Sequence, residues 1–271
     1  MNKKKIGTIL YYVVGILLAV ISLIPFLWMI STSLKSRGAL MSIPIEWIPK
    51  EPSLASYEKV FSKFPFLKTI GNSLFISITY TIITLISSSM AAFAFAKMRF
   101  PKSDLLLKVF LATMMIPTQV TIIPLFVVMN KMGLINTYPS VILPSIFRPF
   151  AVFLLTKCMR RIPSGIIEAA KVDGAGEWMI FTKMCLPLCK SAIASVCILL
   201  FIDYWNMVEQ PVVFLKEQPD KLPLSVFLSQ INNQEVGIAF AASALYMIPA
   251  LLIFLLGEDY LVEGISRSGV K

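Results

Sequence analysis

The chain has 271 residues, of which 57% are hydrophobic and 15% are charged, and its mean hydropathy is +0.78. Soluble globular domains contain roughly 45 to 50% apolar residues, so this composition excludes an ordinary soluble domain and indicates an integral membrane protein. The net charge of +10 would suit nucleic-acid binding, but no compact basic patch with interleaved aromatic residues occurs, and we predict no nucleic-acid partner.

Six stretches are apolar and long enough, or nearly so, to cross a membrane, because a spanning helix needs about 20 mostly apolar residues. They are residues 6–31, 70–96, 105–129, 138–156, 188–208 and 238–256. Trp28 and Met29 stand where a signal peptide would have small residues before its cleavage site, so the first stretch is predicted to stay as a membrane anchor. We therefore predict an all-α integral membrane protein with six transmembrane helices.

Basic residues set the predicted orientation. Lys3, Lys4 and Lys5 precede the first stretch, and an even number of spans then places both termini in the cytoplasm. Counting both termini, 14 of the 25 Lys and Arg residues then lie on the inner side and nine lie in the longer outer segments, a bias that agrees with the positive-inside rule. The cysteines lie at or near this reducing side and the chain has no histidine, so we predict no metal site. The cysteines are Cys158, Cys185, Cys189 and Cys197.

Two outer loops follow from this topology. Residues 34–67 are too polar and too rich in proline to span, and a short helix is expected at 53–61 with Ser53 as its cap. Its aromatic residues suit either anchoring at the membrane interface or contact with an external partner. The second outer loop, residues 209–237, has the same proline-rich and polar character.

The third apolar stretch is predicted to be a kinked, partly polar helix. Pro117 and Pro124 are seven residues apart and share a helical face, with Gln119 and Thr121 close by. Such features are tolerated at membrane depth where neighbouring helices or a water-lined cavity satisfy the backbone. Gln119 and Thr121 are therefore candidates for lining a translocation pathway. Pro249 predicts a similar bend in the last stretch.

Two ionisable residues fall within apolar stretches, Arg148 in the fourth and Asp203 in the fifth. Charges inside a bilayer are costly and mark function or pairing, so the two are a candidate intramembrane ion pair. Asp203 begins the run Asp203, Tyr204, Trp205 and Asn206, whose aromatic faces and hydrogen-bonding groups suit a sugar in a translocation pathway. The same run also suits an interfacial belt of Trp and Tyr.

A charged, helix-forming loop lies between the fourth and fifth apolar stretches. Its first residues favour helix, its middle favours a turn, and a second helical stretch continues to Pro187, which disfavours helix at the residue before it. We predict a helix-turn-helix element on the membrane surface that another protein grips. The helix formers are Glu168, Ala169 and Ala170, and the turn residues are Asp173 and Gly174.

The spacing within this loop resembles the EAA motif of permease subunits in binding-protein-dependent ABC importers. The matching positions are Glu168, Ala169, Ala170, Gly174, Met184, Leu186 and Pro187. Only Met184 departs, standing where the family usually has Ile, and this exchange keeps a similar apolar volume. Residues 114–125, 152–155 and 262–271 also look like those of MalG-type subunits of carbohydrate ABC importers, so the resemblance covers nearly the whole chain.

The resemblance implies a MetI-like permease core in the bacterial cytoplasmic membrane. Residues 1–67 would form the N-terminal helix and first extracytoplasmic loop, residues 68–260 a five-helix core with the EAA loop at 160–187, and residues 261–271 a cytoplasmic tail that reaches toward the ATPases. The loop would supply a coupling helix that sits in a groove of an ATPase. The coupling residues would be Glu168, Ala169, Ala170, Asp173, Gly174, Leu186 and Pro187.

The partners implied by the resemblance are a second, MalF-like permease, two ATPase subunits and an extracytoplasmic sugar-binding protein. ATP hydrolysis by the ATPases would drive sugar uptake through a pathway shared by the two permeases. The chain itself has no GxxxxGK[ST] phosphate loop and no catalytic motif, so we predict neither a cofactor nor an enzyme activity of its own. The alternative is an ion-coupled secondary transporter that depends on Asp203.

Overall fold

The computed structural model describes residues 3–35, 46–63, 65–231 and 236–269, and every regular element in these ranges is helical. The predicted all-α fold is therefore confirmed. Contacts divide the chain into two compact units: unit 1 comprises residues 1–67 and 228–248, and unit 2 comprises residues 68–227 and 249–271. Within the last helix, the boundary between the units falls just before Pro249.

Unit 1 contains α1 (Lys3–Ser33), a long helix whose apolar side chains are exposed, and α2 (Ala55–Lys63). The Ser53 hydroxyl accepts a hydrogen bond from the backbone N–H of Ala55 at 3.2 Å, so the short helix expected after Ser53 forms. The Trp28 and Trp47 rings pack edge to face 5.2 Å apart. Residues 36–45 of the predicted outer loop lie outside the described residues.

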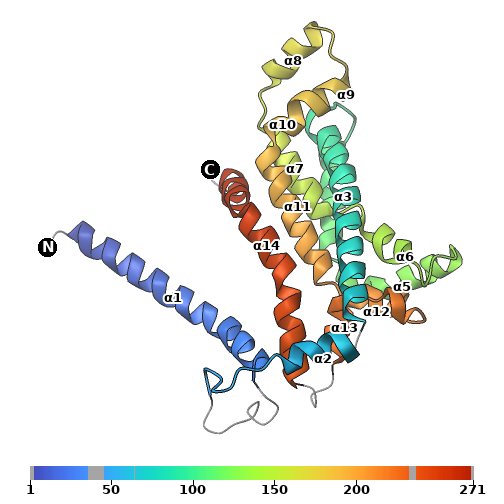
Figure 1. The fold of residues 1–271 in the computed structure, drawn as a ribbon. Helices are drawn as coiled ribbons and strands as arrows, with labels where there is room; N and C mark the ends of the chain where they lie inside the picture. Colours follow the sequence, from blue (N-terminus) through green and yellow to red (C-terminus); the bar gives the residue numbers. More distant parts are fainter. Residues whose placement is uncertain (1–2, 36–45, 64, 232–235, 270–271) are drawn as a thin grey trace. The chain divides into compact units, whose positions relative to one another are not determined.

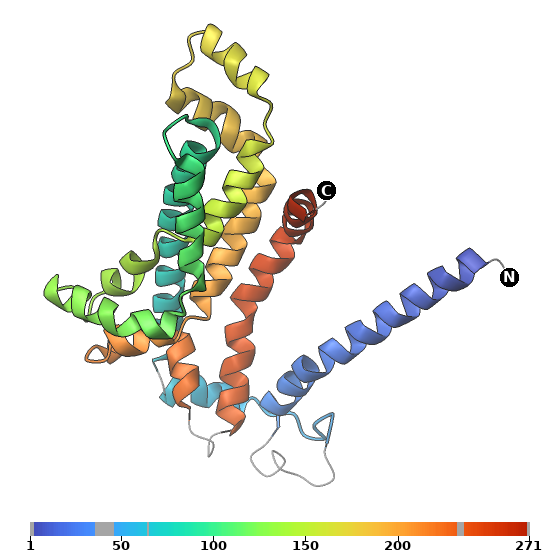
Figure 2. The ribbon, with the colours of Figure 1, turned by 180° about the vertical axis from the view of Figure 1, so that it is seen from behind.

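Unit 2 is built around helices that run side by side in Figures 1 and 2. They are α3 (Phe66–Lys97), α4 (Ser103–Ala112), α7 (Pro149–Arg160) and α11 (Lys190–Trp205). Large side chains such as Tyr80, Leu155 and Met159 are fully buried between them. The last helix, α14 (Val236–Gly269), contacts α11 within this unit, because the Ser195 hydroxyl donates to the Tyr260 carbonyl at 2.6 Å.

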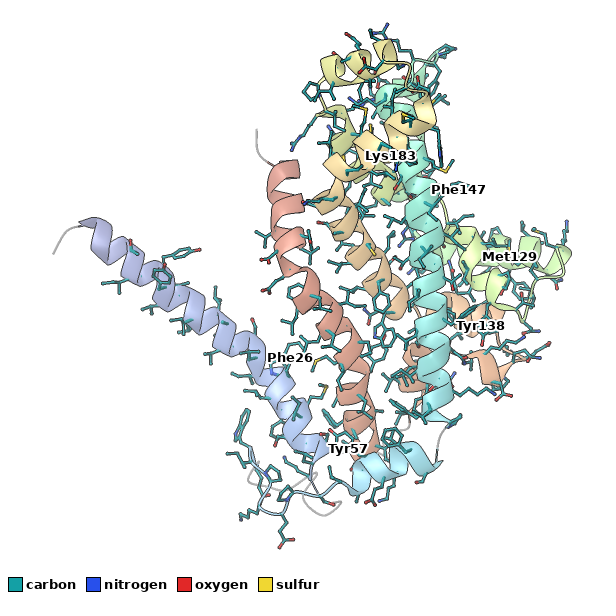
Figure 3. All side chains as sticks on the ribbon, turned by 45° about the horizontal axis from the view of Figure 1, so that its top comes forward. Phe26, Tyr57, Met129, Tyr138, Phe147 and Lys183 are labelled. Atoms are coloured by element: carbon teal, nitrogen blue, oxygen red, sulfur yellow. The ribbon has the colours of Figure 1, made fainter. Side chains whose placement is uncertain are left out.

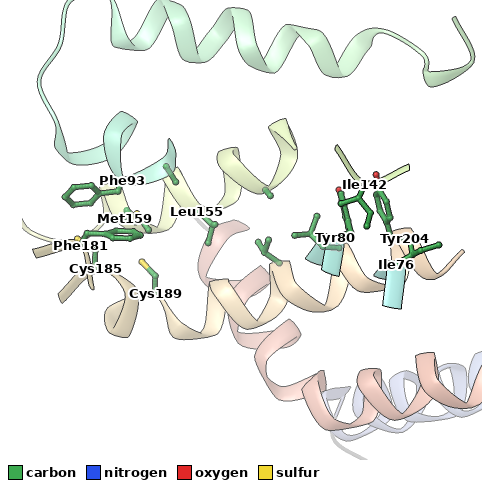
Figure 4. Close-up of a cluster of buried hydrophobic side chains, with 14 of the residues drawn as sticks. Ile76, Tyr80, Phe93, Ile142, Leu155, Met159, Phe181, Cys185, Cys189 and Tyr204 are labelled. Atoms are coloured by element: carbon green, nitrogen blue, oxygen red, sulfur yellow. The ribbon is translucent and has the colours of Figure 1, made fainter. Parts of the chain in front are cut away.

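Shorter elements connect these helices. They are α5 (Thr118–Lys131), α6 (Tyr138–Ile142), α8 (Ser164–Val172), α9 (Glu177–Met179), a π-helix (Ile180–Cys185), α10 (Leu186–Leu188), α12 (Glu209–Phe214), α13 (Leu224–Gln230) and the 3-10 turns Thr113–Met115, Leu143–Ser145 and Pro219–Lys221. Figure 4 shows the buried cluster that runs along unit 2, from Phe93, Phe181 and Cys185 at one end to Ile76, Tyr80 and Tyr204 at the other.

Among the described residues, three continuous helices are long and apolar enough to cross a membrane: Gly7–Ser33, Phe66–Lys97 and Val236–Val262. Three bent pairs of helices also qualify if each pair is one span, which brings the number to six. The pairs are Ser103–Met115 with Thr118–Lys131, bent by 101°, Tyr138–Ser145 with Pro149–Arg160, bent by 44°, and Glu177–Leu188 with Lys190–Trp205, bent by 80°. Each predicted apolar stretch overlaps one of these six.

Prolines explain two of the three breaks. Ile116 and Arg148 both have extended backbones, with ψ angles of 117° and 111°. Each directly precedes a proline, Pro117 and Pro149 respectively. Extended backbone is what a following proline favours. The kink predicted at Pro117 is therefore a complete break, and the stretch is two helices where one was expected. Pro124 and Pro249 lie inside α5 and α14 without ending them.

Candidate functional site

The loop between α7 and α11 is a helix-turn-helix element at one end of unit 2 (Figure 1). Helix α8 ends at Val172, and α9 begins after Gly176. Between them Gly174 has a φ angle of +84°, a conformation that side-chain-bearing residues rarely adopt, which explains a glycine there. Lys171 Nζ lies 2.6 Å from Glu177 Oε1, so an ion pair joins the two helices across the turn.

The outer surface of this loop carries apolar side chains. Val172 is 88% exposed, Trp178 is 66% exposed and Met179 is 56% exposed. Lys183 is exposed on the same segment (Figure 3). Large apolar side chains exposed together on a charged segment indicate a contact surface for another protein. Of the predicted coupling residues, Glu168, Ala169, Asp173, Gly174 and Pro187 are exposed, and Ala170 and Leu186 are half-buried against the core.

The inner surface of the loop is packed onto unit 2. Ile180, Phe181 and Cys185 of the π-helix are buried. The helix continues through Pro187 to Leu188, although Pro187 was expected to end it. A π-helix is wider than an α-helix, so it leaves room for the proline ring, which in an α-helix clashes with the carbonyl four residues earlier.

Polar contacts fix the first stem of the loop, residues 160–162, to neighbouring helices. Lys97 Nζ, at the end of α3, donates to the Ile162 carbonyl at 2.7 Å. Arg160, at the end of α7, donates to Asp104 of α4 at 2.6 Å and to the Phe95 carbonyl of α3 at 3.2 Å. This stem, which follows α7, is thus bound to two further helices of unit 2, α3 and α4.

The structure brings Arg148 and Asp203 together as an ion pair. Arg148 caps the start of α7 and Asp203 lies near the end of α11. The two side chains are 32% and 45% exposed, so the pair is neither sealed in the core nor fully in solvent. Because both charges are matched, the pair adds no net charge to its surroundings.

The aromatic residues after Asp203 are part of the core. Tyr204 is 3% exposed and stacks on Tyr80, and Trp205 is 1% exposed and stacks on Phe201. Asn206 is exposed and donates to the Ile202 carbonyl at 2.9 Å. The structure therefore does not bring Tyr204 and Trp205 to a surface where a sugar could stack on them.

A cavity of about 620 Å³ lies within unit 2 and is lined by residues of α4, α5, α7, α11 and α12. Thr121, Arg148 and Asp203 line it. Gln119 does not: its Nε2 donates to Glu209 Oε1 at 2.8 Å. Of the residues predicted for the translocation pathway or the ion pair, Thr121, Arg148 and Asp203 line the cavity, whereas Gln119, Tyr204, Trp205 and Asn206 do not.

The family described as "Binding-protein-dependent transport system inner membrane component" matches residues 83–267, a range that includes the helix-turn-helix loop and α11. The chain belongs to this family. It is 31% identical to the arabinooligosaccharides transport system permease protein AraQ of Halalkalibacterium halodurans, with 99% of each chain covered. It is 29% identical to the trehalose/maltose transport system permease protein MalG of Thermococcus litoralis, with 100% of this chain and 99% of the relative covered.

A solved structure supports the same fold. A chain of a bacterial ABC transporter involved in the import of the acidic polysaccharide alginate matches with a TM-score of 0.85 and 22% identity, covering 96% of this chain and 98% of that one. The predicted MalG-like permease of MetI-type fold is therefore confirmed, and the relatives are permeases of sugar ABC transporters. Membership of this permease family makes the chain a transport subunit.

Some exposed loop residues and cavity residues of this permease were not predicted from the sequence. Val172, Trp178 and Met179 were not predicted, although the apolar pair Trp178 and Met179, directly after Glu177 in a charged loop, was a usable signal. The cavity residue Gln210 gave no signal, because its place depends on how the broken helices meet. Within the described residues, no three His, Cys, Asp or Glu side chains come together to hold a metal ion.

Proposed function

We propose that this chain is a permease subunit of an ATP-driven carbohydrate importer in the bacterial cytoplasmic membrane, with both termini in the cytoplasm. It pairs with a second, MalF-like permease. Two ATPase subunits bind all the ATP, and an extracytoplasmic sugar-binding protein delivers the sugar. The names of the relatives support a sugar substrate, since they include transport systems for arabino-oligosaccharides and for trehalose and maltose.

The observation that carries this proposal is the two-sided loop at residues 160–187. Its outer side offers Val172, Trp178 and Met179 for docking into an ATPase groove, with Glu168 adding a negative charge. Its inner side is buried, and its first stem is bound to α3 and α4 through Lys97 and Arg160. Closure of the ATPases then moves the loop as a rigid lever that shifts the spans between outward-open and inward-open states.

The ion-coupled alternative is less well supported by the surroundings of Asp203. A carrier that binds a proton or a cation needs an acidic group whose charge is available to that ion. The carboxylate of Asp203 is already neutralised by Arg148. An ABC importer makes no such demand, because its free energy comes from the ATPases.

Co-purification tests the proposal. The tagged chain is extracted from membranes in mild detergent, the proteins that accompany it are identified, and ATP hydrolysis is measured with the binding protein and maltose, trehalose or arabinotriose. We expect a second permease, an ATPase and hydrolysis that rises with a sugar-loaded binding protein. A chain that purifies without any ATPase, yet moves solute in vesicles with an imposed ion gradient, would overturn the proposal in favour of a secondary carrier.

A further inference from the structure

The cavity in unit 2 has a polar wall and an apolar wall. Its volume of about 620 Å³ lies within the range of small-molecule sites, which is roughly 300 to 1,000 Å³. The apolar wall includes the rings of Phe110, Phe147 and Phe150. Phe147, labelled in Figure 3, is 64% exposed and Phe150 is 40% exposed, so their rings are available to a ligand.

The ion pair forms the centre of the polar wall. A guanidinium group has five N–H donors and a carboxylate has two acceptor oxygens. The Arg148–Asp203 contact joins one nitrogen, Nη2, to one oxygen, Oδ2. Both side chains line the cavity and are about a third to a half exposed, so donors and an acceptor of the pair face it. Hydrogen bonds between charged groups and hydroxyls are stronger than those between neutral groups.

Gln210 extends the polar wall. It lines the cavity while 91% of its surface is buried, and its Oε1 has no hydrogen-bond partner in the described structure. Its Nε2 makes only a long contact of 3.4 Å with the hydroxyl of Ser145, another lining residue. A buried amide oxygen without a partner is unfavourable. A small rotation of the amide toward a ligand hydroxyl would satisfy it.

The charge balance of the cavity narrows the class of ligand. Arg148 and Asp203 are the charged residues that line it, and they neutralise each other. A carboxylated sugar would have to displace Asp203 from Arg148 or lie close to an acidic group. A neutral sugar meets no such cost, and its two kinds of surface, hydroxyl groups and C–H faces, match the two walls.

We propose that this cavity is a subsite for a neutral sugar unit of the transported saccharide, held between the phenylalanine rings and a polar wall of Arg148, Asp203, Ser145 and Gln210. The inference rests on the proposed function, because it takes the ligand to be the imported sugar. It goes further in giving this permease chain its own part in sugar binding and in favouring neutral over acidic sugars.

The test uses the complete importer reconstituted in proteoliposomes with its binding protein. Uptake of maltose, trehalose, arabinotriose and an acidic alginate trisaccharide is measured beside ATP hydrolysis stimulated by the binding protein. Gln210→Leu removes the amide while keeping the side-chain size, and Ser145→Ala is a smaller change in case the first variant fails to fold. Gln218→Leu, at an exposed position outside the cavity, is the matched control.

We expect the wild type to favour neutral sugars. Gln210→Leu and Ser145→Ala should lower their uptake about 2- to 10-fold, the effect of one lost neutral hydrogen bond, while stimulated hydrolysis stays within twofold of wild type. Gln218→Leu should match wild type. Wild-type uptake in both cavity variants, or an equal fall in uptake and hydrolysis, would overturn the subsite. Preference of the wild type for the acidic sugar would overturn it too, whereas wild-type liposomes that import no sugar at all would overturn the proposed function itself.

Discussion

Gly174 offers a sharp test of the coupling loop, because two glycines in this loop differ in one property. Gly174 has a φ of +84° and Gly176 a φ of −73°, and a Cβ added at either would meet no atom within 4 Å. Alanine at 174 therefore strains only the backbone, and alanine at 176 strains neither backbone nor packing. The pair separates the conformation of the turn from any effect of added bulk.

The left-handed conformation costs an alanine about 1 to 2 kcal/mol. If the ATPase binds only the native turn, Gly174→Ala lowers its apparent affinity by at most the same free energy, which is a factor of about 5 to 30. Asparagine tolerates this conformation better than alanine, and valine tolerates it worse. We therefore expect the order glycine, asparagine, alanine, valine at position 174, and no change for Gly176→Ala.

The assay titrates the purified ATPase onto the permease pair in detergent and follows stimulated ATP hydrolysis, with thermal unfolding of each variant as a check on folding. The temperature of the thermal transition should hardly change, because the exposed turn of the free permease can relax away from the strained conformation. The cost then arises only when the ATPase binds the native turn. Equal effects of Gly174→Ala and Gly176→Ala, or an asparagine variant as impaired as the valine variant, would show that the turn conformation does not matter for coupling.

Two further predictions compare exposed with buried sites. Trp178→Ala should leave the unfolding temperature unchanged yet weaken ATPase association by about 2 kcal/mol or more, whereas Trp205→Ala should destabilise the chain by about 3 to 5 kcal/mol; the reverse pattern would contradict the assignment of surface and core. Gly257→Ala should lower stability by about 1 to 3 kcal/mol, because its Cβ would overlap the Ile198 side chain, and adding Ile198→Val should recover part of the loss in thermal unfolding. Gly71→Ala, in an open position of another long helix, is the control and should be neutral or stabilising by up to about 1 kcal/mol. If the effects of Gly257→Ala and Ile198→Val were strictly additive, the overlap between these two residues would be contradicted.

The apolar stretches of the sequence predicted where the candidate membrane spans lie, but not where the helices within them break. Each of the six stretches overlaps a helix or bent pair that qualifies as a span. The stretch at 105–129 is nevertheless divided by a bend of 101°. Hydrophobicity is the same for a straight, kinked or broken helix, and the size of a bend depends on contacts such as that of Gln119 with Glu209, which are 90 residues apart.

Local chemistry was a better guide in the loop at 160–187 than near the end of α11. The turn at Gly174 depends on neighbouring residues alone, so the sequence predicted it. Tyr204 and Trp205 follow Asp203 directly but point to other sides of the helix, since each residue of a helix is rotated about 100° from the last. Asp203 thus faces the cavity while the two rings enter the core, and the uniformly apolar α11 gave no pattern from which to tell these sides apart.

The helix breaks and the cavity are two aspects of one arrangement. Ile116 and Arg148, the extended residues at two of the breaks, both line the cavity. Irregular backbone at membrane depth is tolerated where it borders such a space, and a charge there avoids contact with lipid. Arg148 can therefore lie within an apolar stretch because the chain breaks beside it and Asp203 pairs with it on the same wall of the cavity. Pro117 and Pro149, which would disrupt a continuous spanning helix, here follow extended residues that line the cavity and its polar wall.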